Sequence, residues 1–482
     1  MKKLLYTALL ALTLTSCGNE WLEGAKPHDG TADPSLIFVD QASVTNAIVG
    51  AITNMRDYYY DRHVTYGLRQ FYLGLDFMGN DIVSNPGQWW TYESQWNSSI
   101  SSATGYQSSF YWAMHYNIIN DINSKIEGVE GSETLINDVK TTAIAELKAL
   151  RSLAYFNLAR VFQASYAVAG TSAPCVPIYT TGTTPETTGN DRATVGEVYA
   201  LIMSDLDYAI ENISESRSDL FRVNKGVALA WRAIVNLEMQ NWDAAASDAS
   251  AAIEGYSLMD KNTYQTTGFN TLTGNGEWMW GFLFQADQAH GYASLFSHID
   301  CYRSQNGYKN FFINREFVAE FTDSDMRNLF VDNYPEEEDS NWYKYGSKKF
   351  QDNSTACGDY GLMRASELML VRAEALIRSG QEAAGHEVLF SLQSHRDPSA
   401  VISTNTGDAL IEELLLERRK ELFAETAPEY FDSKRYNRGM TRTGNHYVSH
   451  MIEIPAGDPM WLFQIPQTEF DRNPNITTQN QR

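Results

Sequence analysis

The sequence is poor in cysteine and in positive charge. Only four cysteines occur in 482 residues. Cys175, Cys301 and Cys357 lie far apart with no CxxC spacing, which argues against a disulfide framework and leaves a single pair open. Lysine and arginine number 37 against 60 acidic residues, for a net charge of −23. Such a surface repels phosphate backbones, so no nucleic-acid partner is expected.

Long hydrophobic runs are also missing. Nothing after residue 16 approaches the roughly 20 apolar residues that a membrane-spanning helix needs. The sequence has no GxSxG, no glycine-rich phosphate loop and no dinucleotide fingerprint. These absences argue against the corresponding hydrolases, nucleotide-binding enzymes and oxidoreductases. We therefore expect a protein that is not an enzyme and that uses no cofactor.

Two segments contain residues that can bind metals. Residues 335–339 carry four consecutive acids, which indicate a solvated loop or, alternatively, a calcium site. His446 and His450 have a helical metal spacing but lack the glutamate of HExxH and an obvious third ligand. The sequence therefore predicts no metal site.

The N-terminus has the organisation of a bacterial export signal. Lys2 and Lys3 precede an apolar run over residues 4–14, and Ser16 precedes Cys17. A cysteine at this point predicts a lipoprotein signal peptide over residues 1–16, with acyl chains such as palmitate on Cys17. The alternative is an ordinary secretory leader with a chance cysteine. The first interpretation predicts a lipid-anchored protein at a membrane surface.

Apolar periodicity predicts a mostly α protein. Leu147, Leu150, Ala154, Leu158 and Val161 recur at spacings of three and four, which indicates a helix over residues 143–162. Apolar residues on its opposite side predict neighbours on two faces. Further helices are expected over residues 43–61, 108–126, 194–212 and 407–425.

Two segments predict antiparallel helix pairs. Residues 225–240 and 242–254 form one candidate pair, and residues 364–378 and 382–395 form another. Small residues at facing positions allow close approach, as in tetratricopeptide-type repeats. Residues 72–108, 170–191 and 261–359 lack a clear period and indicate long irregular loops, with short strands near residues 277–283.

Several motifs occur in order along the chain. Residues 146–158 read ELKALRSLAYFNL, residues 174–178 read PCVPI, and residues 364–375 read RASELMLVRAEA. ERRKEL at 417–422 precedes DSKR at 432–435, and Pro466, Glu469, Asn473 and Asn480 mark the end. With Cys17 followed by Trp21, this series resembles the SusD/RagB family of outer-membrane lipoproteins. The charged residues of these motifs are expected to form ion pairs within their own helices.

The resemblance implies a SusD-like fold: helix pairs forming a scaffold, long irregular loops and a few short strands. It implies one domain over residues 17–482, with an N-terminal region over 19–215 and a C-terminal region over 275–482. It also implies a surface-exposed, lipid-anchored outer-membrane protein. This protein would capture a glycan and pass it to a SusC-type TonB-dependent transporter. An oligopeptide ligand and, less favoured, a surface glycosidase are the alternatives.

Aromatic side chains in the irregular segments are the candidate ligand contacts, because flat apolar faces with polar edges suit sugar rings and peptides. The first group holds Trp89, Trp90, Tyr92 and Trp96, with Asp76 and Asp81 nearby. The second holds Tyr292, Tyr302, Tyr308, Phe311 and Phe312, and the third holds Trp342, Tyr343 and Tyr345. Because neighbouring residues of an extended chain face opposite ways, Trp89 or Trp90 is expected in the core. We expect alanine at Trp90 or Trp96 to weaken binding with little loss of stability.

Overall fold

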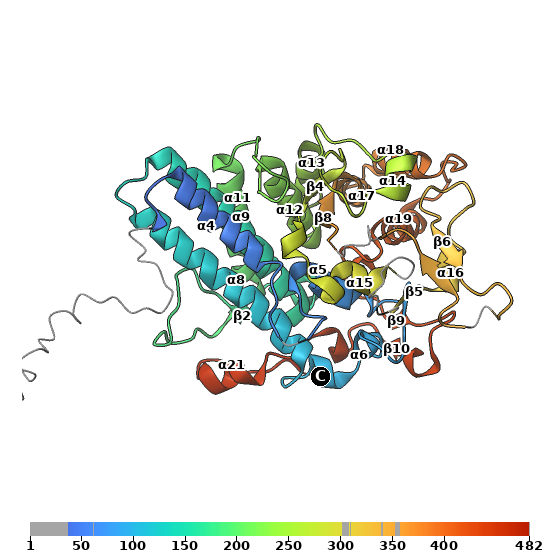
Figure 1. Cartoon of the computed structure of the whole chain (residues 1–482), viewed down its shortest axis with the longest axis horizontal. Helices are drawn as coiled ribbons and strands as arrows, with labels where there is room; N and C mark the ends of the chain where they lie inside the picture. The colour runs from blue at the N-terminus through green and yellow to red at the C-terminus, as the bar shows by residue number, and fades with distance from the viewer. Residues whose placement is uncertain are drawn as a thin grey trace, which may run out of the picture.

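The computed structural model describes residues 37–60, 62–300, 308, 310–338, 341–351 and 357–481. The predicted leader, its acylation residue Cys17 and the candidate contact Tyr302 lie outside the described residues. The fold is mostly α, as predicted, with helices layered around short strands (Figure 1).

The first layer contains long helices from the N-terminal half. They are α4 (Gln41–Asn54), α8 (Tyr106–Gly131), α9 (Asn137–Phe162) and α11 (Val195–Asn212). Helix α9 packs against α8 on one side and α11 on the other, and Leu147, Leu153 and Phe156 are all buried. The predicted contacts on two faces are confirmed. Thr194 and Glu197 form a capping box that starts α11.

The second layer consists of the predicted helix pairs. Helix α12 (Lys225–Glu238) pairs with α13 (Trp242–Ala252), and α17 (Ala365–Arg378) pairs with α18 (Glu382–Arg396). Helix α13 also packs against α17, so the two pairs stack on each other. Helix α19 (Gly407–Leu422) continues this layer beside α17 and α18 (Figure 1).

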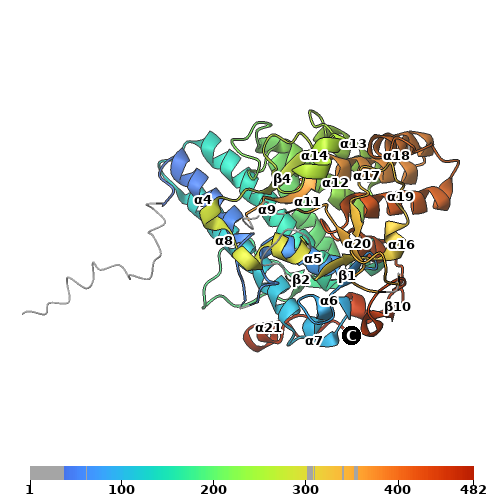
Figure 2. The same ribbon diagram turned by 45° about the vertical axis from the view of Figure 1, so that its right-hand side comes forward.

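A helix that the sequence analysis did not predict lies between these layers. Helix α5 (Gly67–Asp76) is buried at every residue and lies near the middle in both views (Figures 1 and 2). Its polar side chains find distant partners: Arg69 Nη1 donates to the Glu425 carbonyl (3.1 Å), and Gln70 Nε2 to the Ala293 carbonyl (2.9 Å). The expected irregular stretch over residues 72–108 is therefore partly helical.

Short elements complete the chain. The remaining α-helices of the described part are α6 (Thr91–Ser94), α7 (Ser98–Ser101), α10 (Tyr166–Ala169), α14 (Lys261–Thr266), α15 (Leu295–Ile299), α16 (Arg315–Val318), α20 (Pro428–Arg435) and α21 (Gln467–Arg472).

The strands form two-stranded antiparallel ladders. These are β1 (Ile82–Ser84) with β5 (Phe311–Ile313), β2 (Pro174–Pro177) with β3 (Arg192–Thr194), β4 (Trp278–Phe282) with β8 (Tyr360–Arg364), β6 (Phe330–Asp332) with β7 (Tyr345–Ser347), and β9 (Met440–Thr441) with β10 (Glu453–Ile454). Strand β4 confirms the strand expected near residues 277–283. The β1–β5 ladder pairs Val83 with Phe312 and so joins two of the predicted aromatic segments.

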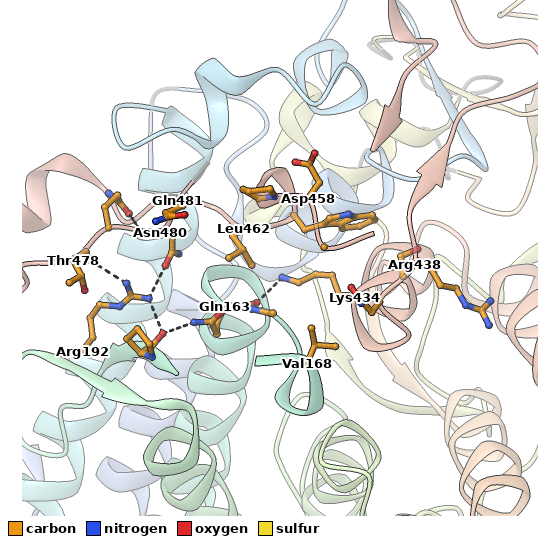
Figure 3. Close-up of a pocket in the computed structure, with 18 residues that line it drawn as sticks. Gln163, Val168, Arg192, Lys434, Arg438, Asp458, Leu462, Thr478, Asn480 and Gln481 are labelled. Atoms are coloured by element: carbon orange, nitrogen blue, oxygen red, sulfur yellow. Dashed lines mark hydrogen bonds between the residues drawn. The ribbon is translucent and has the colours of Figure 1, made fainter. Parts of the chain in front are cut away.

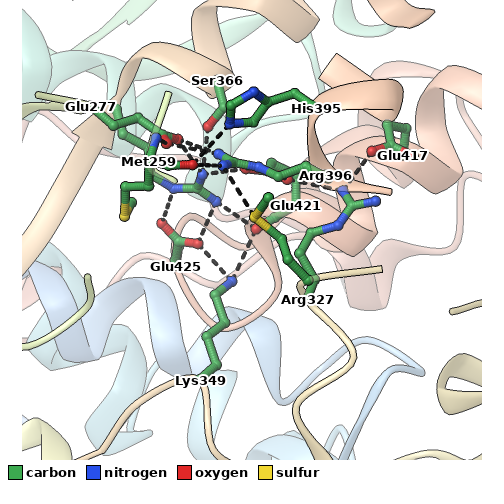
Figure 4. Close-up of polar contacts among 12 residues, drawn as sticks. Met259, Glu277, Arg327, Lys349, Ser366, His395, Arg396, Glu417, Glu421 and Glu425 are labelled. Atoms are coloured by element: carbon green, nitrogen blue, oxygen red, sulfur yellow. Dashed lines mark hydrogen bonds and ion pairs between the residues drawn. The ribbon is translucent and has the colours of Figure 1, made fainter. Parts of the chain in front are cut away.

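The charged motif residues form a buried network between elements (Figure 4). Arg364 binds Glu425 and Glu277, each at 2.8 Å, and also pairs with Glu421. Arg327 and Arg396 reach Glu421 at 2.9 and 2.8 Å. The expectation of pairs within one helix is thus wrong for Arg364, whose partners come from distant segments. Burial alone would raise the pKa of Glu421, but the three guanidiniums hold that pKa well below its usual range.

Candidate functional site

Four rings from separate segments meet where the β1–β5 ladder reaches the surface. The ring of His63 lies 5.4 Å from Trp89, 5.0 Å from Tyr292 and 5.7 Å from Tyr308, measured between centroids. Trp89 also meets Tyr308 edge to face at 6.3 Å. Tyr292 is 56% exposed. We call these four residues the aromatic cluster; it offers open ring surface to a ligand.

A hollow of about 370 Å³ adjoins the cluster. Trp89 belongs to both. The hollow is lined by Arg62, Gly87, Gln88, Trp89, Trp90, Tyr92 and Tyr106. Tyr92 is 51% exposed, and the Arg62 guanidinium lies 4.3 Å from the centroid of the Tyr106 ring. The hollow thus combines aromatic walls, a side-chain amide and one cation.

A tight turn directs the two adjacent tryptophans to opposite sides. Asn85 Oδ1 accepts from the Gly87 amide (3.0 Å), and its carbonyl accepts from Thr91 Oγ1 (2.8 Å). Trp90 then adopts a left-handed conformation with φ of 72°. Its ring stacks on Phe77 with centroids 5.4 Å apart and is only 2% exposed, whereas Trp89 stays half-buried. Trp90 is therefore the core member of the pair.

A buried histidine supports the cluster from beneath. His298 Nε2 lies 3.1 Å from the His63 carbonyl, and the His298 ring stacks on Tyr308 at 5.1 Å. Burial lowers the pKa of His298 to about 3, so the ring is neutral and Nε2 carries the proton that it donates. This histidine fixes His63 and Tyr308 relative to one another.

A buried carboxyl supports the floor of the hollow. The Tyr106 hydroxyl donates to Glu93 Oε1 at 2.5 Å, which fixes the ring under Arg62. Burial raises the pKa of Glu93 to about 7. At neutral pH this group therefore carries only part of a negative charge.

The structure brings together part of the predicted set. Trp89 and Tyr308 belong to the cluster, and Tyr92 lines the adjoining hollow. Trp342 lies apart from them, half-buried against Phe312 at 5.4 Å and Tyr343 at 5.0 Å. Trp89, Tyr92 and Tyr308 of the first and second predicted groups thus lie at one surface, while Trp342 of the third group packs on Phe312 of the second.

Six candidates are buried, which corrects their expected role as ligand contacts. They are Asp76, Asp81, Trp90, Trp96, Phe311 and Phe312. Asp81 pairs with Arg419 at 2.8 Å, and Asp76 Oδ2 accepts from the Ala427 amide at 3.3 Å. Trp96 donates from Nε1 to the Met78 carbonyl at 2.7 Å and packs edge to face on Trp461. Alanine at Trp90 or Trp96 would leave a cavity, so in place of a small loss we expect a large loss of stability.

Sequence reasoning missed Arg62, His63 and Tyr106. The helix expected over residues 43–61 ends at Asn54, and the turns that follow it carry Arg62 and His63 to the site. The run of tyrosines at 58–60, shortly before Arg62 and His63, was the sequence feature that could have indicated this part of the site. It was not recognised because these tyrosines were assigned to the expected helix over residues 43–61.

A cavity of about 390 Å³ near the C-terminal segment is a weaker candidate (Figure 3). Arg192 donates to the Cys175 carbonyl (2.8 Å), the Pro174 carbonyl (3.0 Å) and Asn480 Oδ1 (2.8 Å). Lys434 Nζ donates to the Gln163 carbonyl at 2.9 Å. Arg192 thus connects Asn480 to the β2–β3 ladder, and Lys434 connects α20 to the end of α9. The one tryptophan lining the cavity, Trp461, is buried.

The described ranges contain neither a metal-binding cluster nor a membrane-spanning helix. Within them, no group of three or more His, Cys, Asp or Glu side chains could hold a metal ion. His446 and His450 are both buried, with His446 Nε2 2.9 Å from the Asn80 carbonyl and His450 Nδ1 3.2 Å from Ser84 Oγ. Across the same ranges no helix has the length and apolar character to span a bilayer.

Family models match both halves of the chain. Residues 21–237 match a SusD-like model described as starch-binding and associating with the outer membrane, and residues 302–482 match the model of the SusD family. A SusD-like protein of Bacteroides ovatus is 24% identical over 273 residues, 56% of this chain and 45% of that protein. The SusD-like protein P38 of Formosa agariphila is 24% identical over 464 residues, covering 82% of this chain and 85% of that protein.

Solved structures share the fold over nearly the whole chain. A SusD-like carbohydrate binding protein from Bacteroides vulgatus superposes with a TM-score of 0.81 at 23% identity, covering 91% of this chain and 98% of that chain. A SusD superfamily protein from Bacteroides thetaiotaomicron gives 0.78 at 21% identity, covering 92% of this chain and 100% of that chain. Motifs, family models and fold agree: this chain belongs to the SusD/RagB family.

Proposed function

We propose that the protein is a cell-surface lipoprotein that binds oligosaccharides or polysaccharides through the aromatic cluster and the adjoining hollow. The observation that carries the proposal is the meeting of Trp89, Tyr292 and Tyr308 around His63 at an open surface. Aromatic faces suit the apolar C–H faces of sugar rings, while Tyr hydroxyls and Gln88 can bind sugar hydroxyls. The carbohydrate-binding relative of the same fold supports this choice.

The proposed role is capture followed by delivery to a SusC-type TonB-dependent transporter. Acyl chains on Cys17 would hold the protein at the outer membrane, beside the pore. A tethered binding site raises the local concentration of its ligand, and this requires no covalent chemistry. We therefore propose a binding protein that is not an enzyme. Palmitate labelling of Cys17 and co-purification with the transporter test the anchor and the partner.

Binding measurements with substituted rings test the site. We expect Trp89→Ala and Tyr92→Ala to weaken binding of a glycan found on an array by about tenfold, since each aromatic contact contributes roughly 1–2 kcal/mol. Tyr334→Ala is the matched control, because it removes a comparably exposed ring far along the chain that packs on Tyr343 in the third predicted group. Unchanged affinity in Trp89→Ala and Tyr92→Ala, with weaker binding in Tyr334→Ala, would place the site at the third predicted group instead.

An oligopeptide ligand is the second candidate, because the same rings can hold peptide side chains. Calorimetry with a mixed peptide library and a glycan panel separates the two. Release of new reducing ends during incubation with polysaccharides would instead indicate a glycosidase and contradict the binding role.

A further inference from the structure

Arg62 is the charged residue among those that line the hollow. Its side chain is exposed, and its guanidinium lies over the Tyr106 ring at 4.3 Å. Among the described residues it forms no ion pair. By contrast, Arg151 pairs with Asp205 at 2.8 Å and Arg232 with Asp207 at 2.8 Å.

The hollow around Arg62 holds no opposing charge. Its other lining residues are glycine, glutamine, tryptophan and tyrosine. The Glu93 carboxyl behind the wall is buried and accepts from the Tyr106 hydroxyl, and it also interacts electrostatically with Arg62. The cation–π contact with Tyr106 holds the guanidinium in place at low entropic cost. Within the described part of the chain no atom accepts a hydrogen bond from the guanidinium, so its N–H groups are available to a ligand.

We propose that the hollow selects saccharide units that bear an anionic group, a carboxylate or a sulfate, which Arg62 binds while Trp89 and Tyr92 contact the sugar ring. The proposal rests on the proposed function and specifies its ligand. The planar guanidinium fork matches two oxygens of either anion. Because carboxylate and sulfate can both bind in this way, the experiment tests carboxylated and sulfated glycans separately.

The net charge of −23 does not prevent binding of an acidic ligand. Charges separated by more than about 8–10 Å of water are largely screened at physiological ionic strength. Only groups close to the hollow therefore decide the sign that an acidic sugar meets, and there Arg62 dominates. Long-range repulsion would slow association, and added salt would weaken the Arg62 contact.

The experiment compares matched acidic and neutral ligands. Oligosaccharides of pectin and alginate are tested beside their carboxyl-reduced forms, and sulfated algal and animal glycans beside their desulfated forms. We expect at least one acidic member to bind about tenfold more tightly than its neutral form, an advantage that falls as salt rises. A charge-assisted hydrogen bond to arginine contributes roughly that factor.

Variants assign the preference to one side chain. Arg62→Gln should remove the tenfold advantage of the acidic form over the neutral form, whereas Arg62→Lys should retain part of it. Arg472→Gln, in α21, is the control for loss of one positive charge and should leave the advantage unchanged. Equal binding of acidic and neutral forms, or an advantage that survives Arg62→Gln, would overturn this proposal and leave the glycan-binding role standing. Binding of acidic peptides with no saccharide bound would overturn both.

Discussion

The indole Nε1 of Trp90 donates a hydrogen bond to Nδ1 of His298, with 3.1 Å between the two nitrogens. Nδ1 accepts here because Nε2 donates to the His63 carbonyl. The neutral imidazole of His298 therefore links Trp90, in the core, to the backbone of His63, in the aromatic cluster. The geometry of the surface site depends on a contact that no ligand touches.

Trp90→Phe tests this link. Phenylalanine keeps the stacking on Phe77 but removes the donor, so His298 Nδ1 retains only the weaker contact with Asn310 at 3.3 Å. We expect the free energy of unfolding to fall by about 1–2 kcal/mol. Glycan affinity should fall too, since His63 is no longer fixed. Urea titration and calorimetry measure the two effects, and a stable variant with unchanged affinity would show that His298 plays no positioning role.

Trp96→Ala should separate stability from binding. Trp96 is 2% exposed and meets Trp461 with centroids 4.7 Å apart. Removing a buried ring of this size costs about 3–5 kcal/mol. We expect a large drop in the urea midpoint and, at temperatures where the variant is folded, normal glycan affinity. Tyr92→Ala should show the reverse, and equal stability in the two variants would contradict the burial of Trp96.

Glu421→Gln should be among the most destabilising single changes. Its carboxylate oxygens accept from Arg327, Arg364 and Arg396 inside the network of Figure 4. Removing the charge leaves these guanidiniums short of a partner, which costs about 3–5 kcal/mol in a buried setting. Glu412→Gln is the control, since Glu412 pairs with Arg438 in an exposed position and should cost less than about 1 kcal/mol. If Glu421→Gln and Glu412→Gln lower the free energy of unfolding by similar amounts, the buried network contributes little to stability.

His115→Leu should make the free energy of unfolding less sensitive to pH between pH 7 and pH 4.5. Burial lowers the pKa of His115 to about 4, whereas an unfolded histidine titrates near 6.5. The unfolded chain therefore takes up the proton first, and stability is lost as pH falls from about 6.5 towards 4. Between pH 7 and pH 4.5 the wild type should lose about 2–3 kcal/mol more than the variant. Urea denaturation at both values measures it, and identical losses would refute the assignment.

Cys175 should behave as a protected thiol. It is fully buried, and burial raises its pKa to about 12. In a background with Cys301→Ser and Cys357→Ser and without residues 1–17, we expect no reaction with Ellman's reagent at pH 8 until denaturant is added. Rapid labelling of the folded protein would show that this segment opens.

The long helices could be predicted because their apolar residues repeat with the helical period. Leu147, Leu150 and Leu158 in α9 are examples, and they are all buried. Helix α5 could not be predicted in this way. Arg69 and Gln70 are buried within it and bonded to carbonyls more than two hundred residues away, which no local pattern reveals.

The site was predictable only in part, for a similar reason. The aromatic composition indicated segments that meet in the proposed site, where Trp89 and Tyr308 are half-buried and Tyr92 is exposed. Which of two adjacent tryptophans faces outward depends on the left-handed turn at Trp90. Trp96 is covered by Trp461 from the far end of the chain, so its burial follows from tertiary packing alone.

Asn480 connects a late segment of the chain to the end of a much earlier helix. Its side-chain amide donates to the Phe162 carbonyl at the end of α9 (2.6 Å) and to the Phe463 carbonyl (2.8 Å), while Arg192 donates to its side-chain oxygen. The contact with Phe162 joins residues 318 positions apart. The carbonyl that ends α9 therefore gains this donor only after a further 318 residues have been synthesised.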